Sequence, residues 1–230
     1  MTNEIIPYLE MCQREGLNLQ RGMNFQAGDG YSIILMSIRK NAPYHDRFED
    51  DGTILVYEGH DVSKCDSETD PKSKDQPEIT PAGSLNENGK FHKAAQEYKR
   101  GLRPHERVKV YEKIHNGIWS YNGIFHLVDS WREHDGNRRV FKFKLVAIEE
   151  SPTQLTQMNG FAENRRRIIP TSVKLEVWKR DGGRCIICNA TDELHFDHII
   201  PFSKGGTSLT ADNIQLLCAR HNIEKKDKIE

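Results

Sequence analysis

The stretch CIICNATDELHFDHIIPFSKGGTSLTADNIQLLCARHN spans residues 185–222 and places two pairs of metal-ligating side chains around a polar centre. Two residues separate Cys185 from Cys188, and the same spacing separates Cys218 from His221. A short spacing lets both side chains of a pair point at one ion, and four Cys and His ligands favour tetrahedral zinc. The spacing therefore predicts a structural zinc site in a module too small to hold itself together.

The segment between the two pairs, together with the residue after the second pair, carries side chains that suit a second metal ion. Asp197 and His198 are adjacent on a stretch that reads as a strand, and Asn213 and Asn222 lie on either side of Cys218. A carboxylate oxygen and a carboxamide oxygen can hold Mg²⁺ and leave open positions for phosphate oxygens. A neutral histidine can take a proton from water as a general base. Together these residues are sufficient for metal-assisted hydrolysis of a phosphodiester.

The order of these residues resembles that of the zinc-containing HNH (ββα-metal) nucleases. The likeness covers roughly residues 171–228 and rests on the pattern C-x-x-C…DHIIP-x-x-x-GG…DN-x-QLLC-x-x-HN-x-x-K. The resemblance implies that His198 activates the attacking water, and that Asp197 and Asn222 bind the catalytic divalent ion. It also implies that Asn213 braces the loop that carries the histidine.

One departure from the family pattern concerns the fourth zinc position, which is usually Cys and is His221 here. Imidazole is an equally good zinc ligand, so four-coordinate zinc remains the expectation. In a rival assignment, His221 binds the catalytic ion and zinc keeps three protein ligands. A purely structural role also stays open for single residues. His198 could be a packed residue of a hairpin, and Asn213 could cap a helix. His195 matches no catalytic position of the family.

The first 150 residues read mostly as strands separated by turns, which predicts a small β-barrel or closed sheet. One helix is expected at 91–102, ending at Gly101. The polar stretch 63–90 predicts a long loop, either functional or disordered. The expected strands are YSIILMS (31–37), TILVYEG (53–59), RVKVYEK (107–113), GIFHLVDSW (123–131) and VFKFKLVAI (140–148).

The order of these elements resembles the SRA (SET- and RING-associated, or YDG) domain, a PUA-like barrel. The similarity covers approximately residues 17–150 and includes the run YNGIFHLVDSW at 121–131. The resemblance implies a domain that recognises modified cytosine by flipping it out of the duplex. The expected fold class is α+β, with a PUA-like β-barrel followed by a small ββα-metal zinc domain.

Such a domain needs a pocket that holds an extruded base between aromatic faces and reads its Watson–Crick edge. We expect Tyr44 and Tyr57 to stack on the base, and Asp46 to accept a hydrogen bond from the cytosine amino group. The spacing is one residue longer than the family pattern, so Glu49 or Asp50 can take the place of Asp46. In the alternative interpretation, the two tyrosines pack in the barrel core and the acidic residues lie in a solvated turn.

The expected organisation is two domains joined by a basic linker. The linker carries Arg165–Arg167, which either contact phosphates or solvate the linker. After it, the pattern predicts a helix over 171–183 with an N-capping Thr or Ser and a Gly stop, and a final helix from about Ala211. The expected boundaries are 1–150 for the recognition domain, 151–170 for the linker and 171–230 for the nuclease domain.

Composition favours an intracellular chain over a secreted or membrane-spanning one. Hydrophobic residues make up 36% and charged residues 29%. No apolar run approaches the ~20 residues that cross a bilayer, and the N-terminus lacks the apolar stretch of a secretory signal. The net charge of −1 means that nucleic-acid binding must use local basic patches. We expect a cytoplasmic protein, in which Cys12 and Cys65 are unpaired thiols.

These observations favour a modification-dependent (type IV) restriction endonuclease that defends against foreign DNA. Its barrel would select double-stranded DNA containing 5-methyl- or 5-hydroxymethylcytosine, and its HNH domain would cut nearby with Mg²⁺ or another divalent ion. One HNH site cuts one strand, so double-strand cleavage predicts a homodimer or two enzymes that meet on the DNA. The alternatives are an HNH nuclease whose barrel reads RNA or an unmodified DNA site, and a non-catalytic DNA-binding protein with structural zinc.

Overall fold

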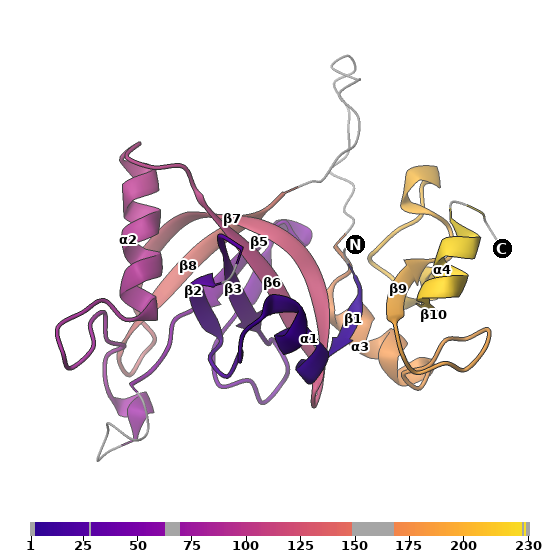
Figure 1. Cartoon of the computed structure of the whole chain (residues 1–230), viewed down its shortest axis with the longest axis horizontal. Coiled ribbons are helices and arrows are strands. Elements are labelled where there is room, and N and C mark those ends of the chain that lie inside the picture. Colours follow the sequence, from indigo (N-terminus) through magenta and orange to yellow (C-terminus); the bar gives the residue numbers. More distant parts are fainter. Residues whose placement is uncertain (1–2, 28, 63–69, 149–167, 227, 229–230) are drawn as a thin grey trace.

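A computed structural model describes residues 3–27, 29–62, 70–148, 168–226 and 228. A strand-rich N-terminal part is followed by a small unit of strands and helices (Figure 1), which confirms the expected α+β class. Among the described residues, no helix is both long and apolar enough to span a bilayer. The helices are α1 (Tyr8–Glu15), α2 (Glu87–Lys99), α3 (Thr171–Arg180) and α4 (Ala219–Lys225). The strands are β1 (Ile5–Pro7), β2 (Met23–Ala27), β3 (Tyr31–Met36), β4 (Arg47–Glu49), β5 (Ile54–Glu58), β6 (Glu106–His115), β7 (Ile118–His134), β8 (Arg139–Ala147), β9 (Leu194–His198) and β10 (Ile214–Cys218).

The N-terminal strands form one curved sheet around a single core. Its strand order is β2-β3-β6-β7-β8-β5-β4, and β1 adds to β7. Only the β3–β6 pair is parallel among the pairs of this sheet. Met23 from one end of this order and Phe48 from the other belong to the same apolar cluster. Because both ends of the sheet contribute to one core, the sheet curls in the manner of a barrel (Figure 1).

Alternation along the strands explains which side chains reach this core. In β8, Phe141, Phe143 and Leu145 are fully buried and two residues apart, as one face of a strand requires. β7 is 17 residues long, and its pairing with β8 shifts register between Leu127 and Asp129. Such an irregularity bends a strand and increases its twist, which helps a long strand to follow a curved sheet.

α2 covers the core and begins earlier than the sequence pattern predicts. The side chain of Asn86 accepts a hydrogen bond from the backbone of Gly89, so the helix starts at Glu87 rather than at residue 91. Phe91 and Ala94 from this helix are buried against the sheet. The predicted loop at 63–90 is therefore wrong for its last residues. Cys65 lies outside the described residues.

The first elements of the chain were not predicted from the sequence. β1 pairs with the start of β7, with Ile5 opposite Ser120. α1 follows at once and ends at Gly16, whose φ of 65° is left-handed and suits glycine. Met11 of α1 packs against Trp119 in a second apolar cluster. Elements of three and eight residues carry too little periodicity to be recognised from one sequence.

The C-terminal unit is a β9–β10 hairpin flanked by α3 and α4. The predicted final helix from Ala211 is wrong, because residues 211–213 form a single 3-10 turn and Ile214–Cys218 forms β10. A short apolar run does not distinguish a buried strand from a helix, and pairing with β9 selects the strand. The predicted cap at the start of α3 is also wrong, since Pro170 occupies the N-cap position. α3 ends at Arg180, before the turn at Gly182 and Gly183.

Buried contacts join the C-terminal unit to the barrel. Nζ of Lys174 in α3 lies 2.9 Å from Oε2 of Glu112 and 2.6 Å from Oδ1 of Asn122, and the lysine is fully buried. The backbone N–H of Phe196 donates to the carbonyl of Asn3 at 3.0 Å. The two parts of the chain thus share an interface. The division at 150 and 170 stays a prediction, and residues 149–167 lie outside the described residues.

Candidate metal centre, nuclease site and base pocket

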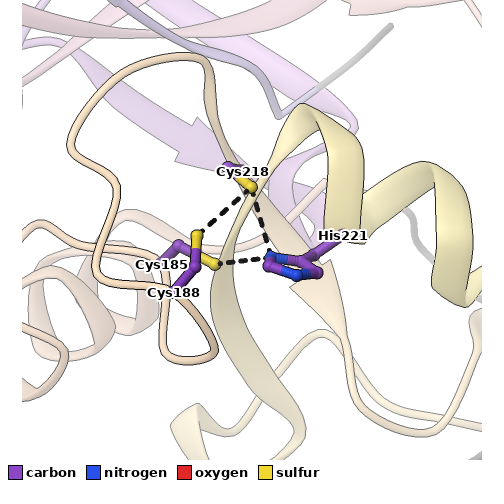
Figure 2. A group of neighbouring side chains, drawn as sticks. All are labelled: Cys185, Cys188, Cys218 and His221. Atoms are coloured by element: carbon purple, nitrogen blue, oxygen red, sulfur yellow. Dashed lines mark hydrogen bonds between the residues drawn. The ribbon is translucent and has the colours of Figure 1, made fainter.

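Four side chains from separate segments converge beside the C-terminal hairpin (Figure 2). Cys185 and Cys188 lie in the loop after α3, Cys218 ends β10, and His221 lies in α4. One ligand atom from each residue lies within 4.8 Å of all the others. Nδ1 of His221 is 3.3 Å from Sγ of Cys185 and from Sγ of Cys218. This donor set and this closeness fit one tetrahedral zinc ion.

Backbone hydrogen bonds form a turn around the first pair, in which Cys185 is buried and Cys188 is exposed. The N–H of Cys185 donates to the carbonyl of Ala190 at 2.8 Å, and the N–H of Asn189 donates to the carbonyl of Cys185 at 2.9 Å. Asn189 has a φ of 61°, a left-handed conformation that asparagine tolerates. Burial raises the pKa of the Cys185 thiol, but backbone hydrogen bonds, above all from Cys218, outweigh this effect and lower it to about 6. A thiolate is the form that binds metal.

Three further predictions concern His221, Cys12 and the basic run Arg165–Arg167. His221 lies among the cysteines, which favours a four-ligand zinc site over the rival assignment. Cys12 is half-buried in α1 and is a free thiol. The basic run Arg165–Arg167 lies outside the described residues.

His198 ends β9 and is held by a residue that the sequence did not reveal. Nε2 of His198 is 2.8 Å from the hydroxyl of Ser208, a buried side chain in the loop before β10. The ring of His198 also meets the ring of Phe202 edge-on, with 6.0 Å between their centroids. Serine is too common in loops for its position alone to indicate this contact, which only the folded loop creates.

Asn213 ties both ends of the loop between β9 and β10. Its Oδ1 accepts from the N–H of Ile200 at 2.8 Å, and its Nδ2 donates to the carbonyls of Ile200 and Thr207 at 3.2 and 2.9 Å. Gly206 lies directly against this junction, where an added Cβ would lie 1.8 Å from the carbonyl oxygen of Ile200. The loop behind His198 is therefore fixed by one asparagine and by a position without a side chain.

Asp197 precedes His198 on β9 and pairs with a lysine that the sequence reading left without a role. Nζ of Lys225 in α4 lies 3.0 Å from Oδ2 of Asp197 and donates to the carbonyl of His198 at 2.6 Å. Nε2 of Gln215 donates to the same carboxylate oxygen at 3.1 Å. Lys225 is buried, so its charge is well placed to fix both β9 residues.

Asn222 lies in α4, one residue after the zinc-site histidine. It lines a small cavity of about 250 Å³ together with Glu4, His195 and Ile223. The described residues show no hydrogen bond between the side chains of Asn222 and Asp197. Burial lowers the pKa of His195, and this effect outweighs the nearby charge of Glu4, which raises it. The hairpin thus carries Asp197 and His198 on β9 and Asn213 just before β10, whereas Asn222 lies on α4 in a cavity that neither Asp197 nor His198 lines.

The residues expected to hold the base line one large pocket in the barrel. Tyr44, Asp46 and Tyr57 all face this cavity, whose volume is about 1310 Å³. Asp46 accepts hydrogen bonds from the backbone N–H groups of Glu58 at 3.0 Å and Ser37 at 3.1 Å. Burial raises the pKa of Asp46 to about 7, although these two hydrogen bonds act to lower it.

The two other acids considered for the same role lie elsewhere. Glu49 lies in β4 and pairs with Arg47, at 2.9 Å between Oε1 and Nε. Asp50 is exposed at the start of a 3-10 turn. Neither is among the residues that line the pocket, whereas Asp46 is.

His60 is a pocket residue that sequence reasoning missed. Its ring stacks on that of Tyr44 with 6.0 Å between centroids, and its Nε2 lies 3.3 Å from the hydroxyl of Tyr57. Burial lowers the pKa of His60 to about 4 and outweighs the charge of Glu87, so the imidazole is neutral near pH 7. An added Cβ at Gly22 would lie 2.7 Å from the Tyr57 hydroxyl and 3.0 Å from Nε2 of His60. The glycine leaves room for both polar groups.

Comparisons with known proteins bear on both parts of the chain. Residues 185–228 match the family model of the HNH endonucleases. Over 218 residues the chain is 27% identical to the histone-lysine N-methyltransferase family member SUVH2 of Arabidopsis thaliana, covering 82% of this chain and 31% of that protein. The SRA domain of SUVH5, solved with methylated CHH DNA, is similar with 21% identity and a TM-score of 0.45, over 66% of this chain and 90% of that one. The modification-dependent TagI restriction endonuclease is similar with 18% identity and a TM-score of 0.42, over 97% and 76%.

The family match covers most of the C-terminal unit, including the metal cluster. It contains all four cluster residues as well as Asp197 and His198. The chain spans about a third of the length of its curated plant relative, 31% of that protein. The match to the HNH endonuclease family model thus lies at the C-terminal end of the chain, after the N-terminal sheet.

Proposed function

We propose that the protein is a modified-cytosine-dependent DNA endonuclease. The observation that carries this proposal is one chain that matches the HNH endonuclease model over residues 185–228 and holds a barrel pocket lined by Tyr44, Asp46 and Tyr57. The nuclease domain supplies phosphodiester hydrolysis, and the barrel pocket selects the DNA that is cut. Cutting DNA that bears 5-methyl- or 5-hydroxymethylcytosine suits a defence against foreign DNA.

In the barrel, the pocket binds the extruded base. Tyr44 and Tyr57 supply aromatic surface, although Tyr57 is almost fully buried and offers mainly its hydroxyl end. Asp46 accepts a hydrogen bond from the exocyclic amino group of cytosine, the contact that a carboxyl group makes with this base. Its two backbone hydrogen bonds hold the carboxyl group in place before the base arrives.

In the nuclease domain, His198 acts as the general base. The contact of Nε2 with the Ser208 hydroxyl orients the ring, and the neutral imidazole takes the proton from water. Asn213 fixes the loop behind the histidine, which keeps the ring in a productive orientation.

Asp197 and Asn222 would hold a divalent ion such as Mg²⁺, for which carboxylate and carboxamide oxygens are suitable ligands. When bound, this ion supplies Lewis-acid stabilisation of the charge that develops on the phosphate. Lys225 keeps the Asp197 carboxylate oriented on β9. Zinc held by Cys185, Cys188, Cys218 and His221 would be structural, because four protein ligands leave no open position for substrate.

A double-strand break requires two such sites, because one HNH site cuts one strand. We therefore propose that the active species is a homodimer, or two copies that meet on the DNA. Sedimentation of the DNA-bound protein tests this point, since a stable 1:1 complex that still makes double-strand breaks would exclude it.

Matched duplexes with and without 5-methylcytosine or 5-hydroxymethylcytosine test the proposal directly. Cleavage with Mg²⁺ or Mn²⁺ is expected only for the modified duplexes. His198→Ala is expected to lose at least about 100-fold in rate while binding DNA normally. Equal cutting of modified and unmodified duplexes would leave a nuclease whose barrel reads another feature, such as an unmodified site. Cutting of RNA alone would identify RNA as the target, and absence of cutting on every substrate would leave a zinc-containing binding protein.

A further inference from the structure

The base pocket is larger than a base needs. Its volume of about 1310 Å³ exceeds the ~300–1,000 Å³ of pockets for drug-sized ligands. A carboxyl group, Asp46, lies on its wall, and three cationic side chains also line it. The three cations are Arg21, Arg39 and Lys113. The pocket therefore has room for a whole nucleotide and positive charge for its anionic phosphate.

Two polar atoms of one pocket segment lack a partner. Oγ of Ser37 and Nε of Arg39 are shielded from solvent and make no hydrogen bond within the described residues. Both residues line the pocket, just after β3. A buried donor without a partner costs free energy comparable to its desolvation, so such groups in a pocket indicate contacts that a ligand completes.

A buried atom without a partner distinguishes Arg39 from the two other cations of the pocket. Asp61 is already neutralised by Arg138 at 2.5 Å and by Lys72 at 3.0 Å. Arg39, like Arg21 and Lys113, takes part in none of the ion pairs of the described residues, but of these three side chains only Arg39 has a shielded nitrogen that makes no hydrogen bond. Guanidinium groups bind phosphate oxygens through paired N–H donors. A phosphate is therefore the ligand group that suits the side chain of Arg39.

Ser37 links this segment to the base-reading carboxyl group. Its backbone N–H donates to Oδ2 of Asp46 at 3.1 Å, while its hydroxyl remains unpartnered among the described residues. A nucleotide whose base reaches Asp46 has its sugar and phosphate near the same segment, because these groups are covalently attached to the base.

We infer that Ser37 and Arg39 form a sugar–phosphate subsite of the pocket, in which Arg39 binds the phosphate of the extruded nucleotide and the Ser37 hydroxyl binds an oxygen of the same sugar–phosphate group. This inference rests on the proposed function, since it requires a nucleotide in the pocket. In this arrangement Ser37 and Arg39 contribute affinity for the nucleotide, whereas Asp46 discriminates the base.

Salt dependence of DNA binding tests the subsite. Binding of a duplex with a single 5-methylcytosine is measured at several salt concentrations, using full-length protein with His198→Ala to prevent cutting. Arg39→Gln is expected to lower the slope of log K against log salt by about 0.9, and to weaken binding about tenfold at 0.1 M salt. Ser37→Ala is expected to weaken binding about fivefold with an unchanged slope, because it removes a neutral contact. Neither variant is expected to change the ratio of affinities for modified and unmodified DNA.

A neutral methylphosphonate placed 5′ or 3′ of the modified nucleotide identifies the phosphate. At one of these positions the wild-type pocket is expected to lose as much affinity as Arg39→Gln does, and the two changes together are expected to cost no more than one. Arg132→Gln is the matched control, because Arg132 is exposed and neither it nor its partner Glu78 lines the pocket. Arg39→Lys keeps the charge, so it is expected to retain the slope.

An unchanged slope in Arg39→Gln overturns the inference, as do additive losses at both methylphosphonate positions. A changed ratio of modified to unmodified affinity would instead make Arg39 a base contact. If wild-type protein binds both duplexes equally, the proposed function fails by itself, and the salt slopes still report whether Arg39 binds a phosphate.

Discussion

Ser208 is the residue on which the orientation of His198 depends. In the proposed role as general base, His198 must hold its ring in one orientation, and the Ser208 hydroxyl contacts its Nε2 at 2.8 Å. Ser208→Ala is expected to lower kcat about tenfold with little change in DNA affinity, because the ring loses a contact that orients it. Ser203→Ala is the matched control, since Ser203 is exposed in the same loop. Equal activity of both variants in single-turnover cleavage would contradict this role.

Asp46 makes stability depend on pH. Burial raises its pKa from 3.8 to about 7, so between these values the native state binds more protons than the unfolded state. The contribution of this group to stability is therefore fully present below pH 4 and is lost as pH rises towards 7. Asp46→Asn is expected to remove a negative slope that approaches ~1.4 kcal/mol per pH unit.

The measurement is urea unfolding of wild type and Asp46→Asn from pH 4 to pH 8. Asp50→Asn is the control, because this carboxyl group is exposed. A difference between wild type and Asp46→Asn that is constant across this range would show that the carboxyl group titrates in the same way in both states.

At the scale of an element, the loop between β9 and β10 depends on Gly206. An added methyl group there meets the carbonyl oxygen of Ile200 and lies 2.8 Å from Nδ2 of Asn213. Gly206→Ala is expected to destabilise the nuclease unit by about 3 kcal/mol and to abolish cleavage. Gly101→Ala is the control, because its added Cβ meets nothing within 4 Å and only its φ of 71° is strained. Thermal unfolding and cleavage assays of the two variants are compared.

The hairpin and α4 also depend on the metal cluster. Ligands from the loop after α3, from β10 and from α4 would be joined by one ion. Chelation of zinc, or Cys188→Ala, is expected to unfold the C-terminal unit and abolish cleavage while the barrel still binds modified DNA. Metal analysis is expected to find one zinc per chain in wild type. Undiminished zinc in Cys188→Ala would contradict the assignment of this ligand.

At the scale of the whole molecule, Lys174 couples the nuclease unit to the barrel. Its ammonium group is buried between Glu112 of β6 and Asn122 of β7. Lys174→Met leaves Glu112 buried without its cation, which is expected to cost about 3–5 kcal/mol. Adding Glu112→Gln is expected to recover part of this loss, as a double-mutant cycle by chemical denaturation can show. Lys179→Met, on the exposed face of α3, is the control and is expected to change stability little.

The sequence by itself determined the metal cluster of this protein. Ligand spacing indicated the Cys and His cluster, because short-range spacing on a knuckle fixes which side chains can meet. The resemblance to HNH nucleases indicated roles for Asp197, His198 and Asn213, and these roles stay predictions. Strong alternation likewise located the central strands of the barrel. The short strand β10 was read as a helix, because its apolar run has no period that separates the two structures.

Only the tertiary structure decided which distant residues complete these sites. Ser208 at His198, Lys225 at Asp197 and His60 at Tyr57 are common residue types at positions without a motif. Of the three acids considered for the base, only Asp46 lines the pocket among the described residues, and Glu49 and Asp50 lie outside it. These contacts depend on packing between segments far apart in the chain, and local spacing carries no information about such packing.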